Sequence, residues 1–296
     1  MSQFTHNTAP NKFVDVAGVT YAYRRFGALS GVPVLFLQHL RGSMDYWDPA
    51  VTNGIAARRP VILFDNEGVG LSTGQTPDTV DAMADNAAAF VRALEVPEVD
   101  VLGFSIGGYA TQPLALRHPE LVRRVVIVGS KPRGGQSEGT APDVAEVAGR
   151  HEVPTLDDIL YLFFDPSETS QAAGRAFWRR RHARTADPDR PTSRQTFNAQ
   201  IAAILDWNQA RGDALEELSG IRQPTLVVNG SHDIMVPTVN SYLMAQRISD
   251  AELVIYPDSG HGSLFQYPHR FVTHVNEFLD REPVLAEETR IAASHD

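Results

Sequence analysis

The serine at position 105 lies in the pentapeptide G-F-S-I-G at residues 103–107, which has the pattern G-x-S-x-G. An apolar run at residues 99–102 precedes it, and residues 106–118 after it have helical character. In a tight strand-to-helix turn, glycines two positions before and after the serine prevent collisions across the turn. The adjoining helix N-terminus favours negative charge. We therefore predict that Ser105 is a nucleophile; the alternative is a glycine-rich turn with an unreactive serine.

A serine hydroxyl is a weak nucleophile unless a nearby base takes its proton. Among the ten histidines of the chain, His261 follows a late apolar run at residues 253–256. Gly260 and Gly262 flank it and let the backbone bring the imidazole into position. We predict that His261 is the base; the alternative is an ordinary histidine of a surface loop.

An acid that orients such a base is expected in another loop. Asp233 follows the apolar run at residues 225–228, and a carboxylate there can hold the imidazole tautomer and stabilise the imidazolium. Asp258 is a rival, but three residues from His261 it is better suited to shape the turn. The order Ser105, Asp233, His261 is one of the known orders of a Ser-His-Asp triad. We predict Asp233 as the orienting acid; the alternative is a helix cap or turn residue.

Acyl chemistry also needs donors for an oxyanion. The backbone N–H of Ile106, directly after the predicted nucleophile, is one candidate. The second is expected from residues 38–42, which follow the apolar run at residues 34–37. We predict the N–H of Leu40 for this role.

The composition limits the class of protein. The chain has 296 residues, 43% of them hydrophobic and 21% charged, which suits a globular protein of one large or two small domains. Its formal charge of −10 repels phosphate backbones, so we expect no nucleic-acid partner. The absence of cysteine excludes disulfides, thiolate nucleophiles and cysteine metal sites. Because the sequence has no H-E-x-x-H, no P-loop and no G-x-G-x-x-G in the required context, we expect no metal and no cofactor.

The N-terminal residues 1–12 are polar, which is unlike a signal peptide. The apolar runs are far shorter than the ~20 residues that span a bilayer. We therefore expect a cytoplasmic protein with a small-molecule substrate and no membrane partner. The sequence leaves the oligomeric state open.

Strand and helix patterns alternate along the chain. Continuous apolar runs, typical of strands covered on both faces, occur at residues 32–37 and 61–64, and we expect further strands at residues 99–102, 122–128, 225–228 and 253–256. Residues 19–23 alternate and suit an antiparallel strand, and residues 80–94 have helical spacing. This order predicts an α/β fold with a mostly parallel central sheet flanked by helices.

One long segment breaks the alternation. From residue 131 to residue 220 we find no convincing strand, and an insertion of about 90 residues is too long for a plain loop. We predict a helical cap at residues 131–220, inserted late in a core formed by residues 1–130 and 221–281, with a polar tail at residues 282–296. The cap holds several aromatics, among which Trp178 is a possible substrate contact. The alternative is that these aromatics fill the core of the cap itself.

The sequence resembles enzymes of the α/β-hydrolase fold, in the broad group of esterases, lactonases and C–C hydrolases. The resemblance covers residues 19–279 and rests on residues 103–107, the turn at residues 65–72 and the loops of Asp233 and His261. These motifs are specific for the fold and the triad and weak on substrate. Relatives that open epoxides or remove halides use an aspartate nucleophile, and this chain has a serine.

The resemblance also reveals a departure. The family's oxyanion loop usually reads His-Gly followed by an apolar residue, whereas this chain has Gln38-His39-Leu40. Gly42 and Trp47 keep their expected spacing. The bulky, titratable His39 either points into the pocket and touches substrate or packs structurally.

The resemblance implies a serine hydrolase that cleaves a small or medium carboxylic ester or lactone through an acyl-enzyme. Two alternatives remain: hydrolysis of a C–C bond in a diketone-like acid, and a ligand-binding member of the fold with little turnover.

Overall fold

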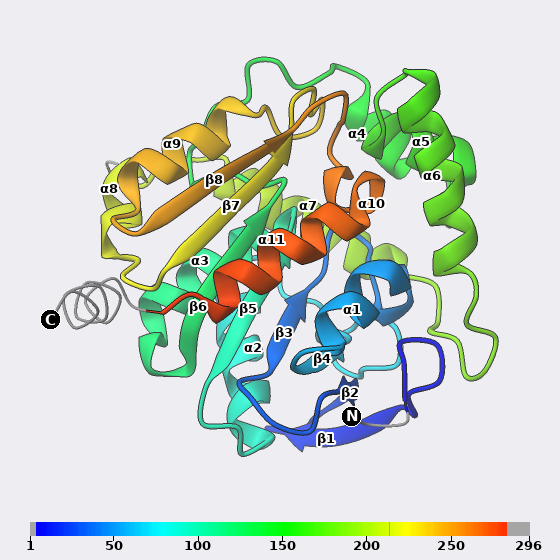
Figure 1. Ribbon diagram of the computed structural model, residues 1–296, viewed down its shortest axis with the longest axis vertical. Helices are drawn as coiled ribbons and strands as arrows, with labels where there is room; N and C mark the ends of the chain where they lie inside the picture. Colours follow the sequence, from blue (N-terminus) through cyan, green and yellow to red (C-terminus); the bar gives the residue numbers. More distant parts are fainter. Residues whose placement is uncertain (1–3, 213, 283–296) are drawn as a thin grey trace, which may run out of the picture.

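The computed structural model describes residues 4–212 and 214–282. The described residues form one sheet in the strand order β1-β2-β4-β3-β5-β6-β7-β8 (Figure 1). Strand β2 is antiparallel to both of its neighbours, and the other pairings are parallel. The strands are β1 (Lys12–Val16), β2 (Val19–Gly27), β3 (Val34–Leu37), β4 (Pro60–Phe64), β5 (Val99–Phe104), β6 (Val122–Val128), β7 (Thr225–Gly230) and β8 (Ala251–Tyr256).

Helices cover both faces of this sheet. One apolar core lies under α1 and α11 and a second lies under α2, α3 and α9, which confirms the predicted α/β architecture with a mostly parallel sheet. Within the described residues, no helix combines the length and the hydrophobicity needed to cross a membrane. The helices outside the insertion are α1 (Pro49–Ala56), α2 (Val80–Ala93), α3 (Ile106–Arg117), α9 (Val239–Arg247), α10 (Ser263–Gln266) and α11 (Pro268–Asp280).

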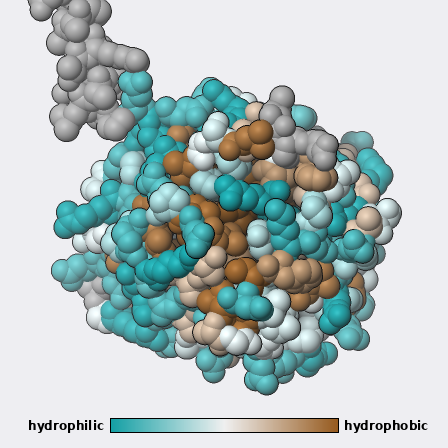
Figure 2. Space-filling view, turned by 90° about the horizontal axis from the view of Figure 1, so that it is seen from below, coloured by the Kyte–Doolittle hydropathy of each residue, from teal (hydrophilic) through white to brown (hydrophobic). Residues whose placement is uncertain are grey.

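Strand β1 is an element that the sequence patterns did not indicate. It lies at the edge of the sheet and is half exposed, so its residues carry no continuous apolar run. Phe13 in this strand is 56% exposed. Seen from below, the surface of the molecule shows hydrophobic patches among hydrophilic residues (Figure 2). Edge strands give weak sequence signals because neither face is fully buried.

Helices also fill the segment between β6 and β7, and α4, α5 and α6 lie beyond the carboxyl ends of the strands (Figure 1). The described part of this segment contains no strand. Its helices are α4 (Val144–Gly149), α5 (Leu156–Phe163), α6 (Glu168–Arg181), α7 (Arg194–Trp207) and α8 (Ala214–Glu217). We call residues 129–224 the inserted segment. Of the predicted tail, all but residue 282 lies outside the described residues.

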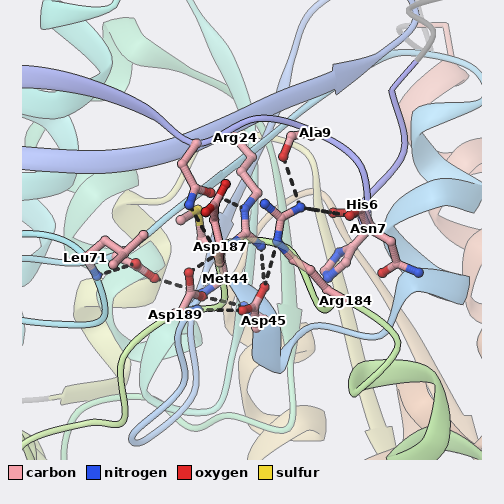
Figure 3. A network of polar contacts seen from close by, with 12 residues as sticks. His6, Asn7, Ala9, Arg24, Met44, Asp45, Leu71, Arg184, Asp187 and Asp189 are labelled. Carbon is pink, nitrogen blue, oxygen red and sulfur yellow. Dashed lines mark hydrogen bonds and ion pairs between the residues drawn. The ribbon is translucent and has the colours of Figure 1, made fainter.

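A buried network of charges ties the inserted segment to the sheet (Figure 3). Arg24 of β2 is fully buried; its Nη1 donates to Asp45, and its Nη2 lies 2.8 Å from Oδ1 of Asp189 in the inserted segment. Asp45 and Asp189 also exchange backbone hydrogen bonds, each N–H donating to the other carboxylate at 2.8 Å. Because Asp45 follows the predicted oxyanion loop closely in sequence, this network helps to position that loop.

Candidate active site

Ser105 sits in a strained turn between β5 and α3. Its backbone angles are φ 58° and ψ −122°, a region that residues other than glycine rarely adopt. A Cβ at Gly103 would lie 2.2 Å from Oγ1 of Thr111, and a Cβ at Gly107 would lie 2.1 Å from the carbonyl oxygen of Leu37. Both glycines are therefore required by close approach of neighbouring atoms. The turn packs α3 directly against the end of β3.

The structure brings Asp233 and His261 together. Nδ1 of His261 lies 2.8 Å from Oδ2 of Asp233, and both side chains are completely buried. The other carboxylate oxygen, Oδ1, accepts the N–H groups of Met235 and Val236, each at 2.9 Å. Three donors thus hold the carboxylate, and the carboxylate in turn fixes the rotation of the imidazole. Since Oδ2 is an acceptor, Nδ1 carries the proton in the neutral imidazole, and Nε2 has a free lone pair.

The imidazole of His261 lies beside the Ser105 turn. Its ring packs against Phe104, the residue before Ser105, with the ring centroids 4.8 Å apart, and against Phe163 at 5.5 Å. Nε2 is buried and has no hydrogen-bond partner among the described residues. A lone pair in this environment is available for a hydroxyl proton. The backbone of α5 braces the loop, because the N–H of Gly262 donates to the carbonyl oxygen of Phe163 at 2.7 Å.

Asp258, the rival acid, takes a different role. Its Oδ2 accepts a hydrogen bond from Oγ of Ser167 at 2.8 Å, and Ser167 is the N-cap of α6. The carboxylate therefore anchors the start of a helix of the inserted segment, in keeping with the turn-shaping role expected for it.

The loop predicted to supply an oxyanion donor follows β3 directly. The N–H of Arg41 donates to Oε1 of Gln200 at 2.8 Å, and the N–H of Gly42 donates to the carbonyl oxygen of His39 at 2.9 Å. The N–H of Leu40, in contrast, has no hydrogen-bond acceptor among the described residues. At the other side of the site, Ile106 is the first residue of α3, where backbone N–H groups have no acceptor within the helix.

His39 packs among aromatic rings and also borders a cavity. It is 4% exposed, and its ring contacts Phe104 and Phe163 edge-on, with centroids 5.5 and 5.3 Å apart. Its Nδ1 lies 2.8 Å from the carbonyl oxygen of Leu40, so Nδ1 carries the proton and Nε2 is an acceptor. Burial lowers the pKa of His39 to about 3; the hydrogen bond to the Leu40 carbonyl opposes this shift, and the Arg181 and His261 side chains add to it. The side chain is thus a neutral part of the wall.

We predict that replacing His39 with glutamine leaves the shape of the pH profile of kcat/KM unchanged between pH 5 and pH 9. His39 has a folded pKa of about 3, so it carries no charge anywhere in this range. Glutamine keeps a donor and an acceptor and cannot titrate. The measurement is kcat/KM against pH for both proteins; the disappearance of an ionisation in the variant would contradict the neutral assignment.

Trp178, proposed as a substrate contact, lies on α6 away from the two cavities beside the site. Its indole packs against the ring of His182, with centroids 4.3 Å apart, and under the guanidinium of Arg181 at 4.6 Å. Neither cavity that Leu40 borders is lined by Trp178. The geometry does not bring this residue to the triad.

Two cavities flank Leu40. The smaller is lined by His39, Tyr46 and Phe163, and the larger, of about 410 Å³, lies under α4 and α7 and includes Lys131. Sequence reasoning assigned no role to Lys131. The available signal was its place directly after β6, at the sheet edge where Ser105 and Asp233 were expected.

Residues 32–268 match the family model of the alpha/beta hydrolase fold. The chain belongs to this family. A solved alpha/beta hydrolase fold protein from Chitinophaga pinensis is 41% identical, with a TM-score of 0.88, over 94% of this chain and all of that one.

Relatives with named activities are hydrolases. The pimeloyl-[acyl-carrier protein] methyl ester esterase of Nitrosomonas europaea is 30% identical over 77% of this chain and 87% of its own length. The 2-hydroxy-6-oxo-2,4-heptadienoate hydrolase of Pseudomonas putida is 28% identical over 93% and 98%, respectively. Others are named as a carbamate hydrolase and as an N-acyl homoserine lactone degrading enzyme. This member of the family is therefore a hydrolase, as the resemblance implied.

Proposed function

We propose that this hydrolase cleaves a small or medium carboxylic ester or lactone through an acyl-enzyme, with Ser105 as nucleophile, His261 as base and Asp233 as orienting acid. The observation that carries the proposal is the buried pair of Asp233 and His261, 2.8 Å apart: the imidazole ring packs against Phe104, the residue before the strained Ser105, and its Nε2 has no hydrogen-bond partner among the described residues. Esterase and lactonase names among the relatives support the substrate class.

The reaction follows from these positions. Oγ of Ser105 forms a bond to the substrate carbonyl carbon while its proton moves to Nε2 of His261. Asp233 stabilises the imidazolium, and the N–H groups of Leu40 and Ile106 donate to the oxyanion. The bond to the leaving oxygen then breaks, and Nε2 returns the proton to the alcohol. Water repeats the sequence on the acyl-enzyme and releases the acid and free Ser105.

A second candidate is hydrolysis of a C–C bond in a diketone-like acid by the same three residues. The relative from Pseudomonas putida, matched over 93% of this chain, favours it. The experiment that decides is an activity screen over matched esters, lactones, a carbamate and a vinylogous diketone acid, with Ser105→Ala as the blank. Turnover confined to the diketone acid would overturn the ester assignment and favour the second candidate.

We predict that a fluorophosphonate labels Ser105 stoichiometrically, with the Oγ–P bond forming as fluoride leaves. In His261→Ala the labelling rate should fall at least about 100-fold, because general-base help of this kind is worth about 10²–10⁴-fold. Intact-protein mass spectrometry over time gives the rate. His269→Ala, which removes an exposed histidine of α11, is the matched control and should label as the unmodified protein does. Equal rates in both variants would remove His261 from the base role.

A further inference from the structure

Lys131 is a buried cation without an ionic partner. Lys12 and Lys131 are the two lysines of the chain, and Lys131 is only 4% exposed. Its Nζ donates to Oγ of Ser137 at 2.8 Å, and within the described residues it forms no ion pair with a carboxylate. Burial lowers the pKa of Lys131, with no charged neighbour contributing. A buried ammonium without a counterion costs stability, so a bound anion would be strongly favoured there.

The surroundings of Lys131 adjoin the triad. The 410 Å³ cavity that Lys131 and Ser137 line also includes Leu40, the proposed oxyanion donor, and Tyr109. Tyr109 lies one helical turn after Ser105 and its N–H donates to the Ser105 carbonyl oxygen at 3.1 Å. The same carbonyl accepts Oγ of Ser130, the neighbour of Lys131, at 3.1 Å. The cavity that Lys131 lines therefore borders Leu40, the proposed oxyanion donor, and Tyr109, which follows Ser105 on α3.

The rest of the cavity is mostly apolar. Side chains of α4 and α7, among them Val144, Ile201 and Ile204, form its wall, and no Asp, Glu, His or Arg lines it. A cavity of this size falls in the range that holds a small organic ligand. An apolar wall with a single cation suits an apolar chain that ends in one negative charge.

We propose that Lys131 and Ser137 bind a carboxylate of the substrate, so that the enzyme prefers esters or lactones that carry a carboxylate on an apolar chain. This specificity rests on the function proposed above. A carboxylate fits better than a phosphate, because one ammonium and one hydroxyl supply few donors. Phosphate sites ordinarily add arginines or a cradle of backbone N–H groups.

Two matched substrate pairs test the preference. In the first, mono-4-nitrophenyl adipate and 4-nitrophenyl hexanoate differ by a carboxylate at the end of the acyl chain. In the second, 6-(butanoyloxy)hexanoate and hexyl butanoate differ at the end of the alcohol. We expect the charged member of at least one pair to have the higher kcat/KM, mainly through a lower KM. Lys131→Met should reduce that preference about 10- to 100-fold, the range for a hydrogen bond to a charged group.

Control variants distinguish the loss of the Lys131 charge from a general loss of folding. Lys12→Met removes the exposed lysine of β1 and should keep the preference. Lys131→Met should retain activity on the uncharged esters, and its Tm should rise by about 2–4 °C, because a buried unpaired charge is removed. Lys131→Gln repeats the test should the methionine variant not fold. Arg181→Met examines a further buried cation near the site, which lines neither cavity beside Leu40.

A binding measurement separates this inference from the proposed function. Calorimetric titration of adipate and of uncharged hexanamide into Ser105→Ala, and into Ser105→Ala combined with Lys131→Met, needs no turnover. Lys131-dependent adipate binding in a protein that hydrolyses no ester would support the anion site and refute the proposed function. Ester turnover without any Lys131-dependent preference in either pair would overturn the anion site alone. A preference lost in Arg181→Met and kept in Lys131→Met would overturn it too.

Discussion

Ser105→Ala should reduce ester turnover at least about 10⁴-fold while the protein stays folded. In serine hydrolases the three residues act as a unit, so loss of the nucleophile leaves only the contributions of binding and the oxyanion donors. Alanine has nearly the volume of serine and keeps the backbone angles of the turn, which are already strained at φ 58°. The measurement is kcat/KM on 4-nitrophenyl hexanoate, with Tm recorded in parallel.

Ser263→Ala is the matched control for this result. Ser263 is buried at the start of α10, two residues after His261, and its Oγ has no hydrogen-bond partner among the described residues. Its hydroxyl is therefore dispensable, and activity should stay within about threefold because such substitutions are close to neutral when no hydrogen bond is lost. Ester turnover that survives in Ser105→Ala would contradict the nucleophile assignment.

Arg24→Met should destabilise the fold by about 3–5 kcal/mol, the range for breaking a buried ion pair from one side. Arg24 is fully buried and bonds Asp45, Asp189 and Asn11 at once, so its loss leaves the 3% exposed side chain of Asp189 without its cation. Urea unfolding at pH 8 measures the free energy. Arg25→Met removes the exposed neighbour on the same strand and should change it by less than about 0.5 kcal/mol.

The loss of stability in Arg24→Met should shrink as the pH falls. Burial raises the pKa of Asp189 above its usual value, while the Arg24 charge opposes that rise. Without Arg24 the folded-state pKa rises further, so the folded protein takes up the proton more readily than the unfolded chain. Protonation then favours folding, and the deficit is full above the raised pKa and shrinks as the pH falls below it. A deficit that is constant between pH 8 and pH 4.5 would refute this account.

The elements of the fold were readily predicted where the sequence has an apolar run. Strand β6 occupies the predicted residues 122–128, and β3, β4, β5, β7 and β8 contain or nearly match their apolar runs. Strand β1 was missed because an exposed edge strand has no apolar run. Helix α6 begins at Glu168, because the Ser167 side chain caps its polar first turn.

Some residues of the candidate site could likewise be predicted from sequence, and others could not. Ser105, Asp233 and His261 could be proposed from sequence because each follows a strand of the parallel part of the sheet, and the carboxyl ends of parallel strands meet at one edge of the sheet. Local glycines mark the turns that such positions need. The order of these residues along the chain and the local pattern around each of them are therefore enough to propose the triad.

The sequence by itself determined the fold class, the order of the predicted functional loops along the chain and the three residues proposed for the chemistry. These features depend on patterns a few residues long. Only the tertiary structure decided that His39 is a neutral wall residue, that Trp178 lies off the cavities and that Lys131 faces a cavity without a counterion. Such surroundings are built by distant parts of the chain: His39 packs against Phe163, and the Lys131 cavity is closed by Ile201 and Ile204. Whether a charge is paired or buried depends on which distant segments pack together, and no short pattern records that.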